Sequence, residues 1–388
     1  MTIEIPRGDA VALTQALTRI DSRNPTLAPE SAGERALAVE LSGLLSRWGF
    51  ETSLQESAPG RPNVVARIGP QDAPALLLAG HLDTVGVEGM THAPWSGEIK
   101  DERLYGRGSC DMKAGVAAIA VAALRAWEQV GDEARRQIVI AIVTDEEYES
   151  LGMRALIASG INAEQAIITE PTRLAICPAH RGFVWAEVNF RGRAAHGSRY
   201  DIGVDAIRHA AFVLSELDHF ETEVLTSRTH PLLGRASLHA STITGGIGMS
   251  TYPDRCTVAI ERRTLPGEST DDVMSELVAA CERVRTRHPQ LNADVRLLTA
   301  QAPSDVAADA AVVRILERGL TAEGRSAHVE GLSAWTDAAL LNEAGIPTIC
   351  FGPGDIGLAH AAEEYVPVRE IEAATAVLTR VAVEWMRG

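Results

Sequence analysis

The sequence predicts an α/β protein with a mostly parallel sheet flanked by helices, into which a smaller α+β domain is inserted. Helical and strand patterns alternate over the first third of the chain. The segment QIVIAIV at 137–143 is almost wholly apolar, as strands covered on both faces are. Near residue 181 the pattern changes to alternating polar and apolar residues, which is typical of strands with one exposed face.

Residues 1–180 are expected to form the first part of the larger α/β domain. Apolar residues recur at helical spacing over 9–20 and 30–48, and an alanine-rich run predicts a long buried helix over 111–130. Short apolar runs flanked by turn residues predict strands at 63–68, 75–79, 137–143 and 166–169.

Residues 181–297 are expected to form the inserted domain. The predicted order is a strand at 183–192, a helix at 204–217, strands at 236–243 and 257–263, a helix at 271–288 and a strand at 293–298. This order is the split βαβ arrangement of ferredoxin-like domains. The α/β pattern then resumes, so residues 298–388 are expected to complete the larger domain.

Charge and cysteine content narrow the classes of protein. The chain has 36 Lys and Arg against 52 Asp and Glu, a formal net charge of −16, whereas binding to nucleic acids or anionic membranes requires a basic surface. The five cysteines are scattered without a CxxC pair, which argues against a disulfide framework and a thiolate zinc site. The first residues lack a signal-peptide pattern, and no apolar run approaches the ~20 residues of a membrane span. We therefore expect a cytoplasmic protein that binds neither nucleic acid nor membrane.

Histidine and carboxylate side chains follow several predicted strands. His81 and Asp83 lie in GHLDTV, directly after the strand at 75–79, and positions two apart on an extended chain point to the same side. Asp83 could therefore accept a hydrogen bond from the second ring nitrogen of a metal-binding His81. The alternative is a surface His–Asp pair at the end of a strand.

The glycine-rich segment GRGSCDMKAG at 106–115 places Asp111 at the start of a predicted helix. The segment matches neither the GxGxxG nor the GK[ST] phosphate-binding pattern. A carboxylate has two oxygens and can bridge two cations, so Asp111 is a candidate metal ligand. The alternative is an ordinary helix N-cap.

Three consecutive acids, Asp145, Glu146 and Glu147, follow the strand at 137–143. Their mutual repulsion is costly unless cations neutralise them or one of them stays protonated. Neighbouring side chains point in different directions, so one glutamate could bind a metal while the other acts as general base on a metal-bound water. The alternative is a solvated acidic loop at the start of a helix.

Two further candidates are Glu170 in TEPT and His360 in the loop FGPGDIGLAHAAEEYVPV. The candidate ligands share one predicted edge of the larger domain, and they are His81, Asp111, Glu147, Glu170 and His360. Two histidines and three carboxylates suit a dinuclear site in which one carboxylate bridges. This donor set favours Zn²⁺, with Co²⁺ or Mn²⁺ as substitutes.

The ordered motifs GHLDTV, GRGSCDMKAG, TDEEYES, TEPT, AAHGS and GLAHAAEEYVPV resemble those of a known metallopeptidase family. Its members include acetylornithine deacetylase, succinyl-diaminopimelate desuccinylase, aminoacylase and carboxypeptidase G. The resemblance covers essentially the whole chain and implies a zinc-peptidase-like larger domain. It implies that His81, Asp111 and Glu170 bind one zinc, and that Asp111, Glu147 and His360 bind the other.

The resemblance also implies the roles of residues around the two zinc ions. Glu146 would act as general base and acid, and Asp83 would support His81. The peptide bond between Asp111 and Met112 would be cis.

By the same resemblance, the inserted domain would form a homodimer and close over the substrate. His196 in AAHGS would reach the active site of a partner subunit and stabilise the oxyanion. Arg263 would bind the substrate carboxylate, a task that suits a planar guanidinium, and the adjacent Arg262 should face the other way. Three other residues stand near the expected pocket: Ser250, where many relatives have a substrate-contacting asparagine, Trp335 and Asp337.

Together these features predict a hydrolase of N-acyl amino acids or small peptide-like amides. A water or hydroxide between two zinc ions would attack the amide carbonyl, and Glu146 would transfer the protons. A dipeptidase or carboxypeptidase, or an amidohydrolase of carbamoyl or ureido groups, would use the same site. A metal-binding scaffold without turnover is a third alternative, against which the presence of Glu146 argues.

Overall fold

The computed structural model describes residues 2–388, which divide into two compact units. The first unit comprises the chain as far as Pro178, together with Val306–Glu330 and Thr336–Gly388. The second unit comprises Ala179–Asp305 and Gly331–Trp335. The second unit extends beyond the expected end at residue 297, because the last strand of its sheet continues to Gln301. The segment 331–335 also belongs to it, which the sequence pattern does not indicate.

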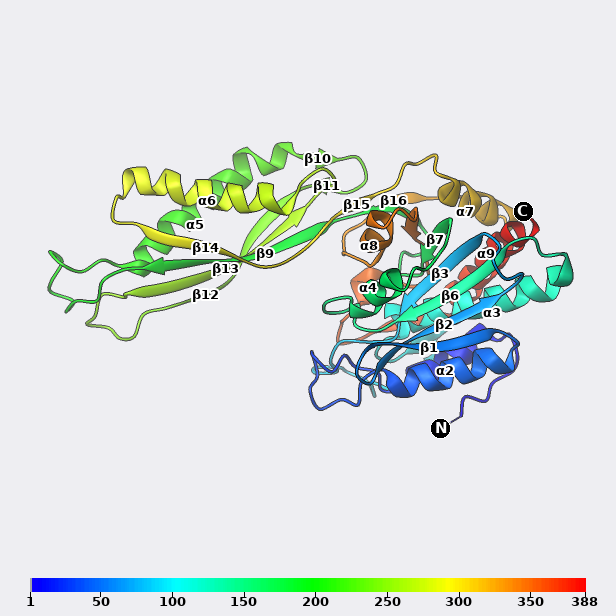
Figure 1. Cartoon of the computed structure of the whole chain (residues 1–388). Helices are drawn as coiled ribbons and strands as arrows, with labels where there is room; N and C mark the ends of the chain where they lie inside the picture. Colours follow the sequence, from blue (N-terminus) through cyan, green and yellow to red (C-terminus); the bar gives the residue numbers. More distant parts are fainter. Residues whose placement is uncertain (1) are drawn as a thin grey trace. The chain divides into compact units, whose positions relative to one another are not determined.

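The first unit is built on a mixed sheet whose central strands are parallel (Figure 1). The strands are, in spatial order, β1 (Glu51–Ala58), β2 (Arg61–Ile68), β6 (Gln137–Val143), β3 (Ala75–His81), β7 (Gln165–Ile168), β17 (Thr348–Cys350) and β8 (Ile176–His180). Strand β3 runs parallel to β6 and β7, and β17 runs parallel to β7. The carboxyl ends of these four strands therefore meet at one edge, where open α/β sheets bind their ligands. This arrangement confirms the predicted fold class.

Helices cover the sheet of the first unit. They are α1 (Ala10–Thr18), α2 (Arg35–Arg47), α3 (Ala114–Val130), α4 (Leu151–Ala158), α7 (Ala311–Ala322), α8 (Ala338–Glu343) and α9 (Val368–Arg387). The alanine-rich α3 packs against α1, α9 and strands β3 and β6, and its small side chains allow this close approach on several sides. A small second sheet holds β4 (Glu98–Lys100), β5 (Arg103–Tyr105) and β18 (Tyr365–Pro367).

Strand β1 lies at the edge of the main sheet and pairs antiparallel with β2. Its sequence, ETSLQESA, is polar and largely exposed, so it lacks the apolar pattern from which a strand is predicted. Strand β6, in contrast, is buried along its whole length and has the bounds that its apolar run predicts. The pattern of apolar residues therefore predicts the central strand β6 better than the edge strand β1.

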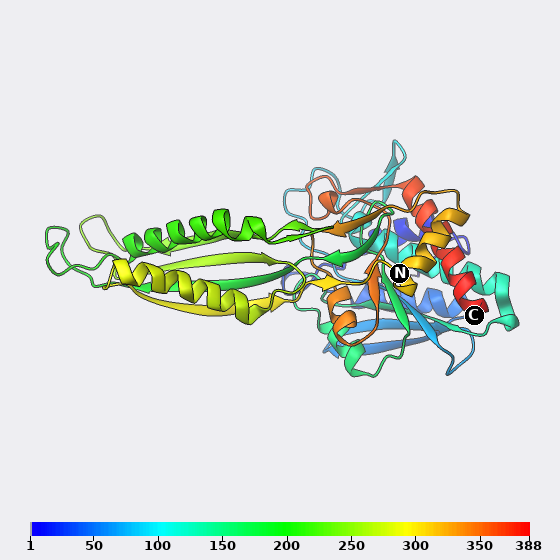
Figure 2. The ribbon, with the colours of Figure 1, turned by 90° about the horizontal axis from the view of Figure 1, so that it is seen from above.

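The second unit contains an antiparallel sheet with the order β12-β13-β9-β14. Its strands are β9 (Gly182–Arg191), β12 (Ser237–Gly245), β13 (Arg255–Thr264) and β14 (Asn292–Gln301), and its helices are α5 (Ala206–Glu223) and α6 (Thr270–Arg287). Figures 1 and 2 show both helices lying along one face of this sheet. Asp205 caps the start of α5, and Ser269 with Asp272 forms a capping box at the start of α6. The split βαβ order predicted for the insertion is present.

Short strands complete the two units. They are β10 (Thr229–His230), β11 (Gly234–Arg235), β15 (Ser304–Asp305) and β16 (Val329–Leu332). Among the helices of residues 2–388, none combines the length and the apolar character that a membrane crossing requires.

Gly115 at the start of α3 makes a close backbone contact beside the strand-end edge. A Cβ at this position would lie 2.2 Å from the main-chain oxygen of Thr169, the residue directly after β7. We expect Gly115→Ala to lower the free energy of unfolding by about 1–3 kcal/mol, because the main chain at residue 115 or at Thr169 would have to shift to make room for the methyl group. Urea unfolding of the metal-free protein measures this loss.

Gly43 provides the matched control, because it also lies within a helix but has room for a methyl group. The nearest atom to a Cβ at this position would be Nη1 of Arg47, at 3.5 Å. Gly43→Ala should leave stability unchanged or raise it by up to about 1 kcal/mol. Equal stability of the two variants would contradict the close contact at Gly115.

Candidate metal centre

Five segments of the first unit bring histidine and carboxylate side chains to the carboxyl edge of its parallel strands. His81 is the last residue of β3 and is 2% exposed. Glu146 and Glu147 follow β6, and Glu170 follows β7. His81 and Glu170 are buried at the strand ends, whereas Glu146 and Glu147 are partly buried.

Asp111 lies in an irregular turn that precedes α3. Gly108 has a φ of 78°, and Asp111 itself departs from helical geometry with φ −118° and ψ 95°. The peptide bond between Asp111 and Met112 is cis, as the resemblance implies. Asp111 is therefore held by the turn and is not an N-cap of α3, whose cap is Lys113.

The carboxylate of Asp111 lies between two histidines. His81 Nε2 is 3.1 Å from Asp111 Oδ1, and His360 Nε2 is 3.6 Å from Asp111 Oδ2. His360 Nε2 also lies 2.9 Å from Oε2 of Glu147. One oxygen of Asp111 thus faces each histidine, which is the arrangement that a bridging ligand requires.

Two overlapping groups of side chains could each hold a metal ion. One contains His81, Asp111 and Glu147, and the other contains His81, Glu146 and Glu170. Within each group, one potential ligand atom per residue lies within 4.8 Å of the others. The groups differ in membership from the two predicted triads, so the assignment of ligands to individual ions stays a prediction.

The donor set fits divalent cations. Oε1 of Glu147 and Oε1 of Glu170 are buried without a hydrogen-bond partner, and a buried polar atom of this kind is costly unless a ligand satisfies it. No cysteine belongs to either group in the described part of the chain. Imidazole and carboxylate donors of this kind suit Zn²⁺, Co²⁺ or Mn²⁺.

The electrostatics of the centre also favour the binding of cations. Burial and the carboxylate of Glu170 raise the pKa of Glu146 well above its ordinary value. Burial and the carboxylate of Asp111 do the same to the pKa of Glu170. The hydrogen bond with Glu147 raises the pKa of His360 to about 9. Cations in the centre would stabilise the ionised acids that the protein alone disfavours.

The prediction that His81 forms a hydrogen bond with the Asp83 carboxylate is wrong. Nδ1 of His81 lies 2.9 Å from the main-chain oxygen of Asp83 and 3.7 Å from its Oδ1. The chain bends at Leu82, directly after β3, so the side chains at 81 and 83 do not share one side of an extended strand. A carbonyl oxygen can only accept, so Nδ1 carries a proton, and Nε2, which lies beside Asp111, is the nitrogen that would bind a metal.

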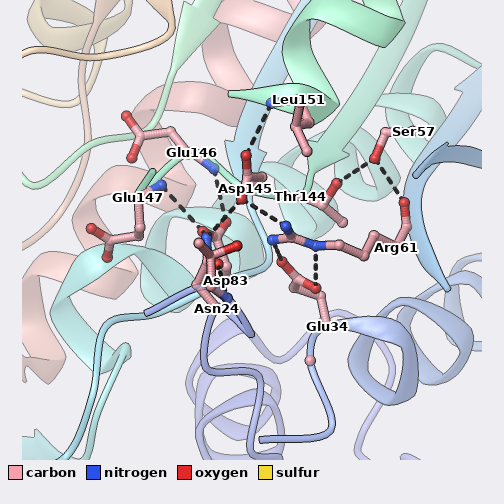
Figure 3. Close-up of polar contacts among 12 residues, drawn as sticks. Asn24, Glu34, Ser57, Arg61, Asp83, Thr144, Asp145, Glu146, Glu147 and Leu151 are labelled. Carbon is pink, nitrogen blue, oxygen red and sulfur yellow. Dashed lines mark hydrogen bonds and ion pairs between the residues drawn. The ribbon is translucent and has the colours of Figure 1, made fainter. Parts of the chain in front are cut away.

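The carboxylate of Asp83 instead binds the segment that carries the two glutamates. It accepts hydrogen bonds from the backbone N–H groups of Glu146 and Glu147, each at 3.1 Å (Figure 3). The side-chain amide of Asn24 donates a third, at 2.8 Å. Asp83 therefore supports the centre through the main chain after β6.

Glu364 supports Asp111 in a similar way, and its role was not predicted. Its Oε1 accepts hydrogen bonds from the backbone N–H groups of Cys110 and Asp111, at 3.0 and 3.2 Å. Arg107 Nη1 lies 2.5 Å from its other oxygen. The only sequence signal is the acidic pair that follows His360, which gives no indication of a main-chain partner.

His196, Ser250 and Arg263, which were predicted to contact the substrate, lie in the second unit. His196 is exposed, with Nδ1 2.8 Å from Oγ of Ser198. The main-chain oxygen of Ser250 accepts a hydrogen bond from Gly197 N–H at 2.7 Å, so the loops of His196 and Ser250 lie side by side. Arg263 is partly exposed, and its Nε lies 2.8 Å from Oε1 of Glu261.

The two adjacent arginines of β13 differ in their surroundings. Arg262 is fully buried and forms an ion pair with Glu268. The guanidinium of Arg263 lies 5.6 Å from the centre of the Phe183 ring. Only Arg263 is accessible enough to meet a substrate, whereas Arg262 serves the core of its unit.

Trp335 and Asp337, expected near a pocket, belong to different units. Trp335 is part of the second unit, where its Nε1 donates to the main-chain oxygen of Ala302 at 3.0 Å. Asp337 is part of the first unit and is 1% exposed, and burial raises its pKa to about 7.

The chain is also similar to known proteins in sequence and fold. Residues 77–384 match the model of peptidase family M20/M25/M40. The chain is 32% identical over 321 residues to an acetylornithine deacetylase of Myxococcus xanthus, covering 81% of each chain. It is 31% identical over 384 residues to a Mycobacterium tuberculosis protein named "Putative succinyl-diaminopimelate desuccinylase DapE", covering 96% of this chain and 98% of the other. The crystal structure of an aminopeptidase from Bacillus cereus shares the fold, with a TM-score of 0.79 at 21% identity over 98% of this chain and 99% of the other.

Proposed function

The chain belongs to peptidase family M20/M25/M40 and is a hydrolase of carbon–nitrogen bonds, and on this premise we propose that it removes the acyl group from N-acyl amino acids. The observation that carries the proposal is the buried centre of His81, Asp111, Glu147 and Glu170, in which two carboxylate oxygens lack partners. The relatives at 31–32% identity are named for the deacetylation and desuccinylation of amino acids.

We propose that two divalent cations, by preference Zn²⁺, bind His81, Asp111, Glu147, Glu170 and His360, with Asp111 as the bridging ligand. Such ions lower the pKa of a bound water and polarise a carbonyl. Glu146 lies in the same cluster as His81 and Glu170. In the proposed reaction Glu146 accepts a proton as water attacks the amide carbonyl, and it then delivers the proton to the departing amine.

In this proposal the second unit supplies the contacts to the substrate. Arg263 binds the free carboxylate of the amino acid, and Ser250 contacts the substrate from a neighbouring loop. His196 of one subunit stabilises the oxyanion in the site of its partner. The exposure of His196 and Arg263 is consistent with these roles.

A panel of substrates tests the proposed function. Metal-depleted protein is reconstituted with Zn²⁺, Co²⁺ or Mn²⁺ and assayed with N-acetyl and N-succinyl amino acids, dipeptides and N-carbamoyl amino acids. We expect kcat/KM to be at least about tenfold higher for one of the N-acyl amino acids than for any dipeptide. A preference for dipeptides or carbamoyl compounds would replace the proposal with a peptidase or carbamoylase, and turnover of none by metal-loaded protein would indicate a scaffold.

We further propose that the protein is a homodimer joined through the edge strand β12. This strand pairs on one side with β13, and its residues from His239 to Gly245 are exposed. An unpaired strand edge is a template for a second copy. Ile243, 54% exposed, is a position where a charge would oppose that pairing.

Analytical ultracentrifugation tests this assembly. The wild-type protein should sediment as a dimer and Ile243→Lys as a monomer. Leu297→Lys is the control, because Leu297 is 42% exposed on the opposite edge strand β14. A monomeric wild-type protein, or a monomer produced equally by Leu297→Lys, would refute pairing through β12.

A further inference from the structure

A buried charged cluster lies next to the segment that carries Glu146 and Glu147 (Figure 3). Arg61, at the start of β2, has an 11% exposed side chain and lies between two carboxylates that are fully buried, Glu34 and Asp145. Its Nη1 is 2.7 Å from Oδ1 of Asp145, and its Nε is 3.2 Å from Oε2 of Glu34. The guanidinium thus binds two acids that come from different segments of the chain.

Asn24 joins this cluster to the Asp83 carboxylate. Its side-chain amide donates to Oδ2 of Asp83 at 2.8 Å and to Oδ1 of Asp145 at 3.0 Å. One amide group has two N–H donors, so both bonds can form together. The loop of Asn24 is itself fixed, because its backbone N–H donates to the main-chain oxygen of Thr84 at 2.8 Å.

The two carboxylates that Asn24 connects hold the backbone of a single short segment. Asp83 accepts hydrogen bonds from the backbone N–H groups of Glu146 and Glu147, each at 3.1 Å. Oδ2 of Asp145 accepts hydrogen bonds from the backbone N–H groups of Glu149 and Leu151, at 3.2 and 3.3 Å. Four backbone N–H groups between residues 146 and 151 therefore donate to two buried carboxylates. Figure 3 shows that the side chains of Glu146 and Glu147 project away from these carboxylates.

A contribution to the stability of the fold does not by itself explain why this charged cluster is buried. Burying an arginine with several carboxylates incurs a desolvation cost that can exceed the attraction, and apolar residues of similar size often serve stability as well or better. Fixed geometry is the better explanation, because a base and a metal ligand on adjacent residues work only if their shared backbone is held in place.

We propose that Asn24 and Arg61 are positioning residues for the catalytic segment. Arg61 fixes the carboxylate of Asp145, Asn24 links Asp145 to Asp83, and these two acids hold the backbone of Glu146 and Glu147. Neither Asn24 nor Arg61 touches substrate or metal in this scheme. The expected loss of activity rests on the proposed hydrolase function. The expected loosening of the backbone at Glu146 and Glu147 does not.

The test uses two variants with two readouts. Asn24→Ala removes the link, and Arg61→Lys keeps the charge but cannot bridge both acids as the planar guanidinium does. We expect either variant to lower kcat for the best substrate by about 10–100-fold, with KM changed less than about twofold. Hydrogen–deuterium exchange of the metal-free protein should be faster in the peptide covering residues 144–151.

Asn342→Ala is the control, because the Asn342 side chain also binds backbone of the first unit, at Thr348, with bonds of 2.9 and 2.8 Å. Asn342→Ala should leave both kcat and exchange at 144–151 unchanged. A folded Asn24→Ala with normal kcat, or with wild-type exchange in this peptide, would overturn the proposal. If one variant fails to fold, the other decides by the same criteria. Because exchange needs neither metal nor substrate, it decides the backbone role even if the wild-type protein hydrolyses none of the panel.

Discussion

Replacing Glu146 with glutamine is expected to lower kcat by about 10²–10⁴-fold while the metal content stays at the wild-type value. Glutamine has nearly the same shape but cannot accept the proton of the attacking water or return it to the amine. The assigned metal ligands are left in place, because Glu146 is not among them. Steady-state kinetics with the best N-acyl amino acid and metal analysis of the purified variant measure the two quantities.

Glu149→Gln is the control for this experiment. Glu149 lies in the same segment and loses the same charge on substitution, but its side chain is exposed, and its contact with Asp145 is made by the backbone N–H. It should retain wild-type kcat. A Glu146→Gln variant with nearly normal kcat would show that another group transfers the proton, and a loss of metal would show that Glu146 is a ligand.

Three of the five predicted ligands, His81, Glu147 and Glu170, could be placed from the sequence because they lie at or just after the ends of apolar strands. Buried strands such as β3 and β6 appear as apolar runs, and polar residues directly after them must lie at the carboxyl edge of a parallel sheet. The structure brings His81, Asp111, Glu147 and Glu170 together there, with His360 beside Glu147. Asp111 and His360 lie in a turn and a loop, so their place in the cluster rested on residue type and on the family resemblance.

The supporting residues could not be found in the same way. Asp83 and Glu364 act on backbone N–H groups, which every residue except proline has, so their partners leave no signature in the sequence. Asn24 and Asp145 are 121 positions apart, and only the folded chain brings them within 3.0 Å. Such contacts depend on where loops bend, as the bend at Leu82 illustrates, and hydrophobic periodicity says nothing about loops.

Asp111→Asn is expected to abolish turnover by removing metal, in contrast to Glu146→Gln. The two carboxylate oxygens of Asp111 face His81 at 3.1 Å and His360 at 3.6 Å. An amide keeps one oxygen but turns an N–H₂ donor toward one of the two positions, where it would repel a cation and cannot bind it. We therefore expect the ions per chain to fall from two to one or none, and kcat to fall to the rate of chelator-treated wild-type protein.

Metal analysis and titration of the metal-free variant with Zn²⁺ or Co²⁺ distinguish this outcome from misfolding. Asp132→Asn, a change of the same kind at an exposed position, should keep both ions and full activity. The fold should survive in Asp111→Asn, because the backbone of residues 110 and 111 is held by Glu364 and does not depend on the Asp111 side chain. If the variant binds two ions as tightly as the wild type, Asp111 is not the bridging ligand. One retained ion with residual turnover would assign the reaction to a single metal, with the second ion contributing affinity or substrate orientation.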